Sequence, residues 1–290
     1  MPKKKNNTTS MITKLKRSRA YRIAYHDYDF IDTDNLRPVR LQLELLKPEL
    51  ILRQHKIMST IVVFGGTRIV QPSVARTQVK RLETRLRRKP TDTGLKRQLS
   101  IARTILTKSH FYDEAREFSH LVSLECQRDE KHEYVIVTGG GPGIMEAANR
   151  GAHDVDAKSI GLNIKLPMEQ EPNAYISPDL CMQFHYFALR KMHFFLRARA
   201  LLAFPGGYGT MDELFEALTL VQTRVIKRLP IILFGEEYWR RLIDFDYLVR
   251  EGTIDEEDIR LFVYTDKASQ AWDYIKYFYE SRGNGRSRPF

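Results

Sequence analysis

The sequence has little cysteine and no long apolar run. Its 290 residues contain two cysteines, Cys126 and Cys181, which are too few for a disulfide framework. No Cys/His ligand spacing suggests zinc, so we expect no metal site and activity that survives chelators. The sequence has no apolar stretch long enough for a transmembrane helix, and the basic start of the chain does not resemble a secretory signal. A reducing, cytoplasmic location fits these absences best.

Two common nucleotide-binding fingerprints are also missing. The G-x-G-x-x-G pattern fails from each possible first glycine, because another residue stands where the last glycine belongs: Ile144, Glu146 or Asp212. No G-x-x-x-x-G-K-[ST] run occurs, which excludes an ATP-hydrolysing P-loop. A nicotinamide dehydrogenase is therefore disfavoured, and a smaller phosphorylated ligand remains.

The formal net charge of +11 raises the possibility of a nucleic-acid partner. Residues 1–20 carry seven positive charges, and the segment after Glu280 adds three with no acid. Ten of the eleven surplus charges thus lie near the ends, and no aromatic-interleaved basic stripe is present. Nucleic acid and membrane are not expected as main partners. A regulator that binds DNA or RNA would depend on the basic ends alone.

Apolar runs alternate with helical segments from about residue 59 onward. Strands are expected near 61–64, 134–137, 160–164, 180–184, 201–204 and 230–234, with helices between them. Continuous apolar strands of this kind indicate a parallel sheet covered on both faces. Right-handed crossovers then give an α/β, doubly wound Rossmann-like layout.

Four segments are expected along the chain. These are a disordered basic tail (1–20), an N-terminal helical extension (21–58), a Rossmann-like nucleotide-binding catalytic domain (59–282) and a second basic tail (283–290). Within the extension, leucines predict a helix from 36 to 56 that Pro48 should kink or interrupt. Inside the main domain, the charge run 80–89 fits either a phosphate-binding patch or the solvated face of a surface helix.

Three glycine-rich turns, at Gly65, Gly139 and Gly206, each follow a predicted strand and should lie at the carboxyl edge of the sheet. The turn Pro205-Gly-Gly-Tyr-Gly-Thr210 opens a helix, so its backbone N–H groups are suited to a phosphate. The alternative is a tight turn with Thr210 as the helix N-cap and Glu213 completing a capping box.

The residues around these turns resemble the LOG ("Lonely guy") family of nucleoside 5′-monophosphate phosphoribohydrolases, in particular its longer bacterial branch. Pro205 to Glu213 looks like the family's PGGxGTxxE signature, Arg190-Lys191 like its arginine–lysine pair, and Gly139 to Asn149 like its second glycine-rich turn. The resemblance covers roughly residues 59–265. It implies catalytic roles for Arg190 and Glu213, and substrate binding by the following residues: Gly139, Gly140, Gly141, Gly143, Lys191, Gly206, Gly207, Tyr208, Gly209 and Thr210.

The resemblance implies hydrolysis of the N-glycosidic bond of AMP or an N6-modified AMP, without a cofactor, by a homo-oligomer. Glu213 would meet the sugar and Arg190 would orient it or hold the phosphate, whereas Asp212 points about 100° away around the helix. We expect base recognition near Phe184–Phe187 and in the loop after Ile164. The acid that protonates the leaving base is not assigned, although Glu146 is one possibility.

Two other readings bear on the same residues. Some members of the family carry a lysine decarboxylase label, but no lysine lies within the Gly206 turn to form a Schiff base. The same superfamily also includes Rossmann-like carriers that hold a phosphorylated cofactor or nucleotide without turning it over. The presence of both Arg190 and Glu213 favours the enzyme over the carrier.

Overall fold

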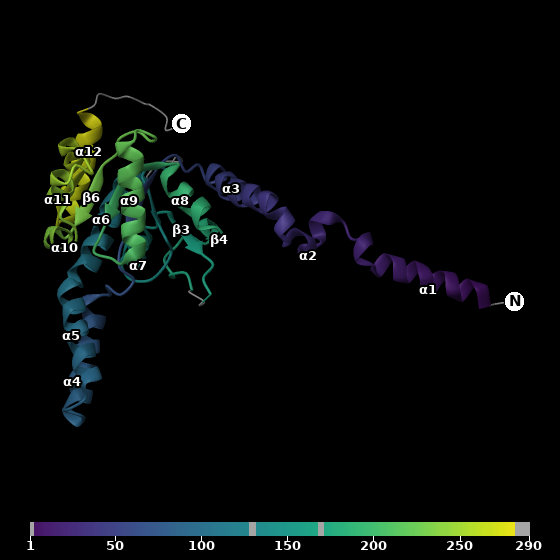
Figure 1. The fold of residues 1–290 in the computed structure, drawn as a ribbon, viewed down its shortest axis with the longest axis horizontal. Helices are drawn as coiled ribbons and strands as arrows, with labels where there is room; N and C mark the ends of the chain where they lie inside the picture. The colour runs from purple at the N-terminus through teal and green to yellow at the C-terminus, as the bar shows by residue number, and fades with distance from the viewer. Residues whose placement is uncertain (1–2, 128–131, 168–170, 282–290) are drawn as a thin grey trace. The chain divides into compact units, whose positions relative to one another are not determined.

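The computed structural model describes residues 3–127, 132–167 and 171–281, and it divides into two compact units, Met1–Lys47 and Pro48–Phe290. The second unit is built on one sheet of seven parallel strands in the order β4-β3-β2-β1-β5-β6-β7. Figure 1 shows part of this sheet, including β3, β4 and β6, among the helices of the second unit. The strands are β1 (Thr60–Phe64), β2 (Val135–Thr138), β3 (Ser159–Ile164), β4 (Cys181–Phe184), β5 (Ala198–Ala203), β6 (Ile231–Phe234) and β7 (Phe262–Thr265). The predicted doubly wound α/β fold is confirmed.

Helices cover both faces of the sheet. They are α6 (His110–Cys126), α7 (Ile144–His153), α8 (Phe187–Phe195), α9 (Tyr208–Gln222), α10 (Glu236–Leu242), α11 (Phe245–Arg250) and α12 (Ala268–Glu280). Helices α4 (Pro72–Arg88) and α5 (Thr93–Lys108) instead pack against each other around a small core of their own. Alternate residues of β1 enter different cores, because successive side chains of a strand point to opposite faces. Ile61 and Val63 pack with residues of α6, α7 and α12, whereas Val62 and Phe64 pack with residues of α8 and α9.

The strand order fixes where a ligand would bind. Chain connections from β1 run through β2, β3 and β4 in one direction, and from β5 through β6 and β7 in the other. The order therefore reverses between the paired strands β1 and β5. In open α/β sheets the crevice at such a reversal, beyond the carboxyl ends of the strands, is the usual ligand site.

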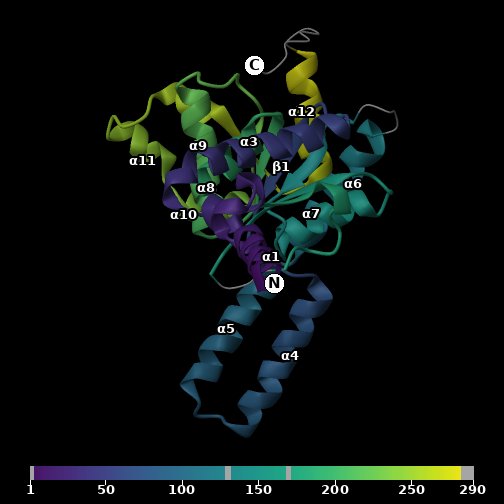
Figure 2. The same ribbon diagram turned by 90° about the vertical axis from the view of Figure 1, so that its right-hand side faces the viewer.

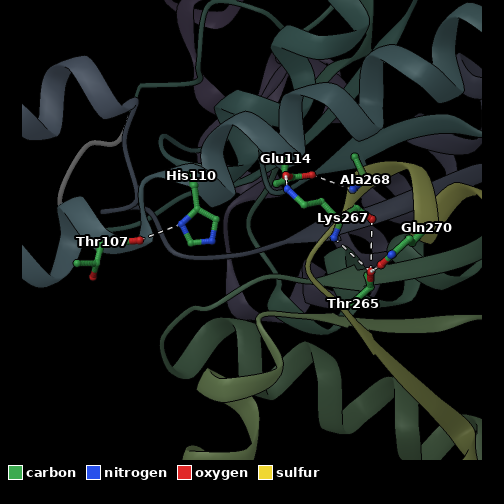
Figure 3. A network of polar contacts seen from close by, with 7 residues as sticks. All are labelled: Thr107, His110, Glu114, Thr265, Lys267, Ala268 and Gln270. Carbon is green, nitrogen blue, oxygen red and sulfur yellow. Dashed lines mark hydrogen bonds and ion pairs between the residues drawn. The ribbon is translucent and has the colours of Figure 1, made fainter.

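Strand β7 was not predicted from the sequence, which placed the last central strand at 230–234. A set of polar contacts fixes this edge strand against α6 (Figure 3). The Glu114 carboxylate of α6 accepts hydrogen bonds from the Lys267 ammonium, at 2.9 Å, and from the Ala268 N–H, at 2.8 Å. Because Ala268 is the first residue of α12, Glu114 supplies the helix with an N-terminal acceptor from outside.

The boundary between α8 and β5 also differs from the prediction. A helix was expected to continue from 185 to 200, but α8 ends at Phe195 and β5 begins at Ala198. Ala198 and Ala200, which fall within the predicted helix, are buried in the strand instead. Tertiary packing thus overrides the helical propensity of alanine at this boundary.

The first unit differs from the expected disordered tail. Its residues form α1 (Lys3–Arg17), short 3₁₀ turns, α2 (Tyr28–Ile31) and the start of α3 (Arg37–Gln54). Lysines and an arginine fill the last turn of α1, where positive charge complements the helix dipole. Helix α3 is also continuous through Pro48, so the predicted interruption is wrong. The buried Leu52 and a bidentate Arg197–Glu49 pair hold the turn that follows Pro48 in place.

None of the helices in the described ranges has both the length and the apolar character needed to span a bilayer. Both cysteines are free thiols. The predicted C-terminal tail, 283–290, lies outside the described residues.

Candidate active site

The three glycine-rich turns meet at the sheet reversal. The Gly66 N–H donates to the Pro205 carbonyl at 2.9 Å, and the Gly66 carbonyl accepts from the Ile144 N–H at 3.3 Å. Gly143, at φ +74°, packs so closely that a Cβ there would lie 2.4 Å from the Gly66 carbonyl oxygen. The turn after β1 is therefore bonded to the turns after β5 and β2, as their common position at the carboxyl edge predicts.

The turn after β5 presents the start of α9 without a side-chain cap. The helix begins at Tyr208, and its N-cap is Gly207, which has no side chain to accept a hydrogen bond from the N–H groups of the first turn. The Met211 N–H is bonded to the Gly207 carbonyl, and the N–H groups that precede it in a helix have no intrahelical acceptor. Those of Tyr208, Gly209 and Thr210 are thus available to a ligand anion.

The alternative interpretation of this turn is wrong. Thr210 is the third residue of α9 rather than its N-cap, and the Glu213 carboxylate does not fold back onto the turn. Thr210 instead packs under Gly206, where a Cβ would lie 2.1 Å from the Thr210 Oγ1. Gly206 is therefore required for close packing between the turn and the first turn of its helix.

Tyr238, a residue that sequence reasoning missed, holds the same turn from the far side. Its hydroxyl donates to the Gly206 carbonyl at 2.5 Å, and the Lys108 ammonium lies 4.6 Å from its ring centroid. Tyr238 lies on α10, directly after β6, so it too belongs to the carboxyl edge. Its position after a strand was the available signal, but no glycine turn marked it.

Arg190 and Glu213 form a buried ion pair. The Arg190 guanidinium donates from Nη2 to the Glu213 Oε1 at 3.1 Å, with 9% and 6% of the two residues exposed. The guanidinium carbon lies 5.2 Å and 5.7 Å from the ring centroids of Phe187 and Phe194. Its buried Nε has no hydrogen-bond partner among the described residues. The structure thus brings together Arg190 of α8 and Glu213 of α9, and the bond to Glu213 uses one of the five guanidinium N–H donors.

Burial is the largest influence on the pKa values of Glu213 and Arg190. It raises the pKa of Glu213 to about 7, with the neighbouring Asp212 adding to the rise and Arg190 opposing it. Burial also lowers the pKa of Arg190, and the two carboxylates of Glu213 and Asp212 oppose that shift. A carboxyl group whose pKa is near neutrality can take up and release a proton at the working pH, as a general acid–base group must.

Lys191 is engaged on the other side of α9. Its ammonium pairs with the Asp212 carboxylate at 2.6 Å and with the Glu216 carboxylate at 3.2 Å. Partial burial lowers its pKa, but the two hydrogen-bonded carboxylates outweigh that effect and the pKa is raised. Asp212 therefore faces Lys191 while Glu213 faces Arg190, as the helical angle between them predicts.

The second glycine turn is held by amide side chains. The Asn173 Nδ2 donates to the carbonyls of Gly140, at 3.2 Å, and Gly141, at 3.1 Å. The Thr138 hydroxyl accepts from the Gly140 N–H at 3.0 Å and donates to the Asn149 Oδ1 at 2.7 Å. Asn173 lies in the loop after β3, far along the chain, and no sequence motif marked it.

Other expected site residues are placed as follows. Glu146 accepts a hydrogen bond from the buried Tyr112 hydroxyl at 2.8 Å, so this carboxylate already has a partner. Phe184 is buried in the core and cannot contact a base, which corrects part of that expectation, whereas Phe187 is half exposed. Residues 168–170 of the loop after Ile164 lie outside the described residues. No group of three His, Cys, Asp or Glu within the described part of the chain is placed to hold a metal.

Comparison with known proteins adds an independent line of evidence. A family model described as possible lysine decarboxylase matches residues 145–275. The probable cytokinin riboside 5′-monophosphate phosphoribohydrolase LOG4 of Oryza sativa subsp. japonica is 28% identical over 152 residues, which cover 51% of this chain and 65% of that protein. The cytokinin riboside 5′-monophosphate phosphoribohydrolase LOG2 of Arabidopsis thaliana is 25% identical over 166 residues, which cover 56% and 74%.

Among solved structures, the Moco carrier protein of Chlamydomonas reinhardtii shares 15% identity and a TM-score of 0.45 over 77% of this chain and 98% of its own. A similarity this weak carries no argument about function. The sequence relatives, by contrast, confirm the resemblance indicated by the PGGYGT turn and by Arg190 and Glu213: the chain is similar in sequence to proteins of the LOG family.

Proposed function

We propose that the protein hydrolyses the N-glycosidic bond of a nucleoside 5′-monophosphate, AMP or an N6-modified AMP, to the free base and ribose 5-phosphate. The observation that carries the proposal is the buried Arg190–Glu213 pair one turn beyond an uncapped, glycine-rich helix start. The names of the plant relatives support the same class of reaction. A simple carrier has no need for a buried carboxyl group of near-neutral pKa beside its phosphate site.

The phosphate is bound at the start of α9. The N–H groups of Tyr208, Gly209 and Thr210 donate to its oxygens, and the positive end of the helix dipole adds to the attraction. The Arg190 guanidinium has N–H donors beyond the one bonded to Glu213, and it supplies a further, charged donor. A nucleoside lacks the 5′-phosphate and therefore cannot make these contacts. We expect the protein to bind nucleoside 5′-monophosphates and not the corresponding nucleosides.

The chemistry takes place one helical turn further on. As the C1′–N bond breaks, its electron pair goes to the base, which gains a proton, and the sugar develops oxocarbenium character. The Glu213 carboxylate stabilises that charge and takes a proton from the water whose oxygen bonds to C1′. It releases this proton to solvent, which balances the proton that the leaving base takes from solvent. Arg190 keeps the carboxylate in place and favours its ionised form. The Schiff-base lysine that a decarboxylase needs is not found in the Gly206 turn.

Incubation of the protein with AMP in the presence of EDTA is expected to release free adenine and ribose 5-phosphate, while adenosine stays intact. Chromatography of the base and an assay of the reducing sugar measure the two products. Release of adenine from both compounds would contradict the phosphate site. If AMP binds tightly and is recovered unchanged, the enzyme proposal fails for AMP and a carrier becomes the better interpretation.

The pH profile is expected to follow Glu213. Because the ionised form is the active one and burial raises the Glu213 pKa to about 7, kcat should rise about tenfold per pH unit below neutrality and level off above it. A carboxyl group at the ordinary value of 4.5 would give a flat profile over that range. The 5′-phosphate titrates near about pH 6 in free solution, so kcat, which reports the bound complex, is measured rather than kcat/KM alone. A profile already flat from about pH 5 upward would contradict the role of Glu213.

A further inference from the structure

Helices α4 and α5 form a hairpin with its own small core. Side chains of both helices pack together, namely Val79, Leu82, Leu95, Leu99 and Ala102. Figure 2 shows the two helices side by side, leading away from the sheet. The hairpin starts a few residues after the Gly65-Gly66 turn and returns at α6. Each helix buries only the stripe that faces its partner, so the remaining faces are left to solvent.

The hairpin is strongly basic. Residues 72–108 hold eleven lysines and arginines against two acids, Glu83 and Asp92, a net charge of +9. All of the eleven except Lys108 are exposed. Acids elsewhere in the chain cancel the charge of the hairpin in the total, so a simple sum of charges attributes the surplus of +11 to the two ends alone. The net charge alone therefore concealed a local basic surface.

One broad face of the hairpin combines cations from both helices. The Arg103 guanidinium of α5 donates to the Glu83 carboxylate of α4 at 2.8 Å, which marks the side that the two helices share. Residues three, four or seven positions apart lie on the same side of a helix. On α4, Arg76, Lys80 and Arg87 therefore flank Glu83, and on α5, Lys96 lies two turns before Arg103. We call these five cations the basic face.

We propose that the basic face binds the sugar–phosphate backbone of duplex nucleic acid. Helix α4 is about 25 Å long at 1.5 Å per residue, and a duplex presents a phosphate charge about every 1.7 Å along its axis, so several cations can engage at once. Only Glu83 offsets the charge on this face. Binding through phosphates alone is independent of base sequence and weakens steeply with salt.

The composition of the hairpin favours duplex nucleic acid over single-stranded nucleic acid and over a membrane surface. Residues 72–108 contain no Phe, Tyr or Trp, and single-stranded nucleic acid is usually held by bases stacked on such rings. A membrane surface is bound by helices that present an apolar face together with their charges. The large exposed apolar residues of the hairpin are Val74 and Ile101, one on each helix, which form no such face.

Fluorescence anisotropy of the full chain with a labelled RNA duplex, and a DNA duplex of the same sequence, of about twenty base pairs tests the proposal. Affinity is expected to fall with salt, and the triple variant K80Q/R87Q/K96Q should lose at least about tenfold in affinity at low salt. It should also flatten the slope of log K against log salt by about three, one per phosphate contact removed.

The matched control removes the same charge from the opposite side of α4. The variant R81Q/R85Q/R88Q keeps the hairpin core and the N-terminal basic segment, and it is expected to keep most of the affinity. Circular dichroism and thermal unfolding check that both variants fold. The proposal is overturned if the two variants weaken binding equally, if neither duplex binds, or if the protein instead cosediments with anionic phospholipid vesicles while leaving both duplexes free.

Discussion

Replacement of Glu213 by Gln is expected to lower kcat for AMP by a factor of about 10²–10⁴ while leaving AMP binding largely intact. The amide fills the same buried volume and still accepts a hydrogen bond from Arg190, but it cannot take a proton from water or stabilise a positive sugar. The phosphate contacts at the start of α9 are untouched. Steady-state release of adenine gives kcat, and calorimetry of AMP binding to the variant gives the affinity.

Asp212→Asn is the matched control for this variant. Asp212 is the adjacent carboxylate on the same helix, yet it pairs with Lys191 and its side chain is 55% exposed. Its loss is expected to change kcat by no more than a few-fold. Equal loss of activity in the two variants would show that general charge near α9, rather than the buried carboxyl group, supports the reaction.

The second large effect is expected at the glycines of the same turn. Gly206→Ala should weaken AMP binding and lower kcat/KM by about 10²-fold, because the new methyl group would lie 2.1 Å from the Thr210 Oγ1 and 2.6 Å from its Cβ. Thr210 or the turn must shift, and either movement displaces the N–H groups that bind the phosphate. Affinity for AMP, kcat/KM and the unfolding temperature measure the effect.

Gly207→Ala, at the adjacent position, is the control for Gly206→Ala. A Cβ at Gly207 has no protein atom within 4 Å, and its φ of −100° is accessible to alanine. This variant is expected to unfold at the temperature of the natural protein, whereas Gly206→Ala unfolds earlier. If Gly206→Ala retained full affinity for AMP, the packing of Thr210 beneath the turn would have no part in phosphate binding.

The parts of the fold that follow from local pattern could be predicted from the sequence. Continuous apolar runs placed β1, β2 and β6 within a residue or two, and their alternation with helices predicted the parallel sheet. Edge strand β7 was missed although Leu261-Phe262-Val263-Tyr264 is a short apolar run, and of the strand's residues only Phe262 is buried. The helix of residues 3–17 was missed because its composition is polar and basic throughout.

The candidate site also has a part that could be predicted from the sequence and a part that could not. The Arg190–Glu213 pair and the turn that precedes it follow from a spaced motif, and the structure brings them together. Tyr238 and Asn173 act through side-chain hydrogen bonds to backbone carbonyls, from a distant helix and a distant loop, and such contacts leave no periodicity in the sequence. The pKa of Glu213 could not be predicted either, because it depends on how completely α8 and α9 enclose the carboxyl group.

The bonds of Gly66 to both neighbouring turns have an evolutionary consequence. Three separate stretches of backbone are bonded to one another through main-chain atoms, so the shape of the proposed phosphate site depends little on which side chains surround it. Relatives with a different residue at position 187, or a different loop after β3, could then bind another base while keeping the three bonded glycine turns. A family with this architecture can change its substrate by single substitutions, because each intermediate protein still folds and keeps the proposed phosphate site.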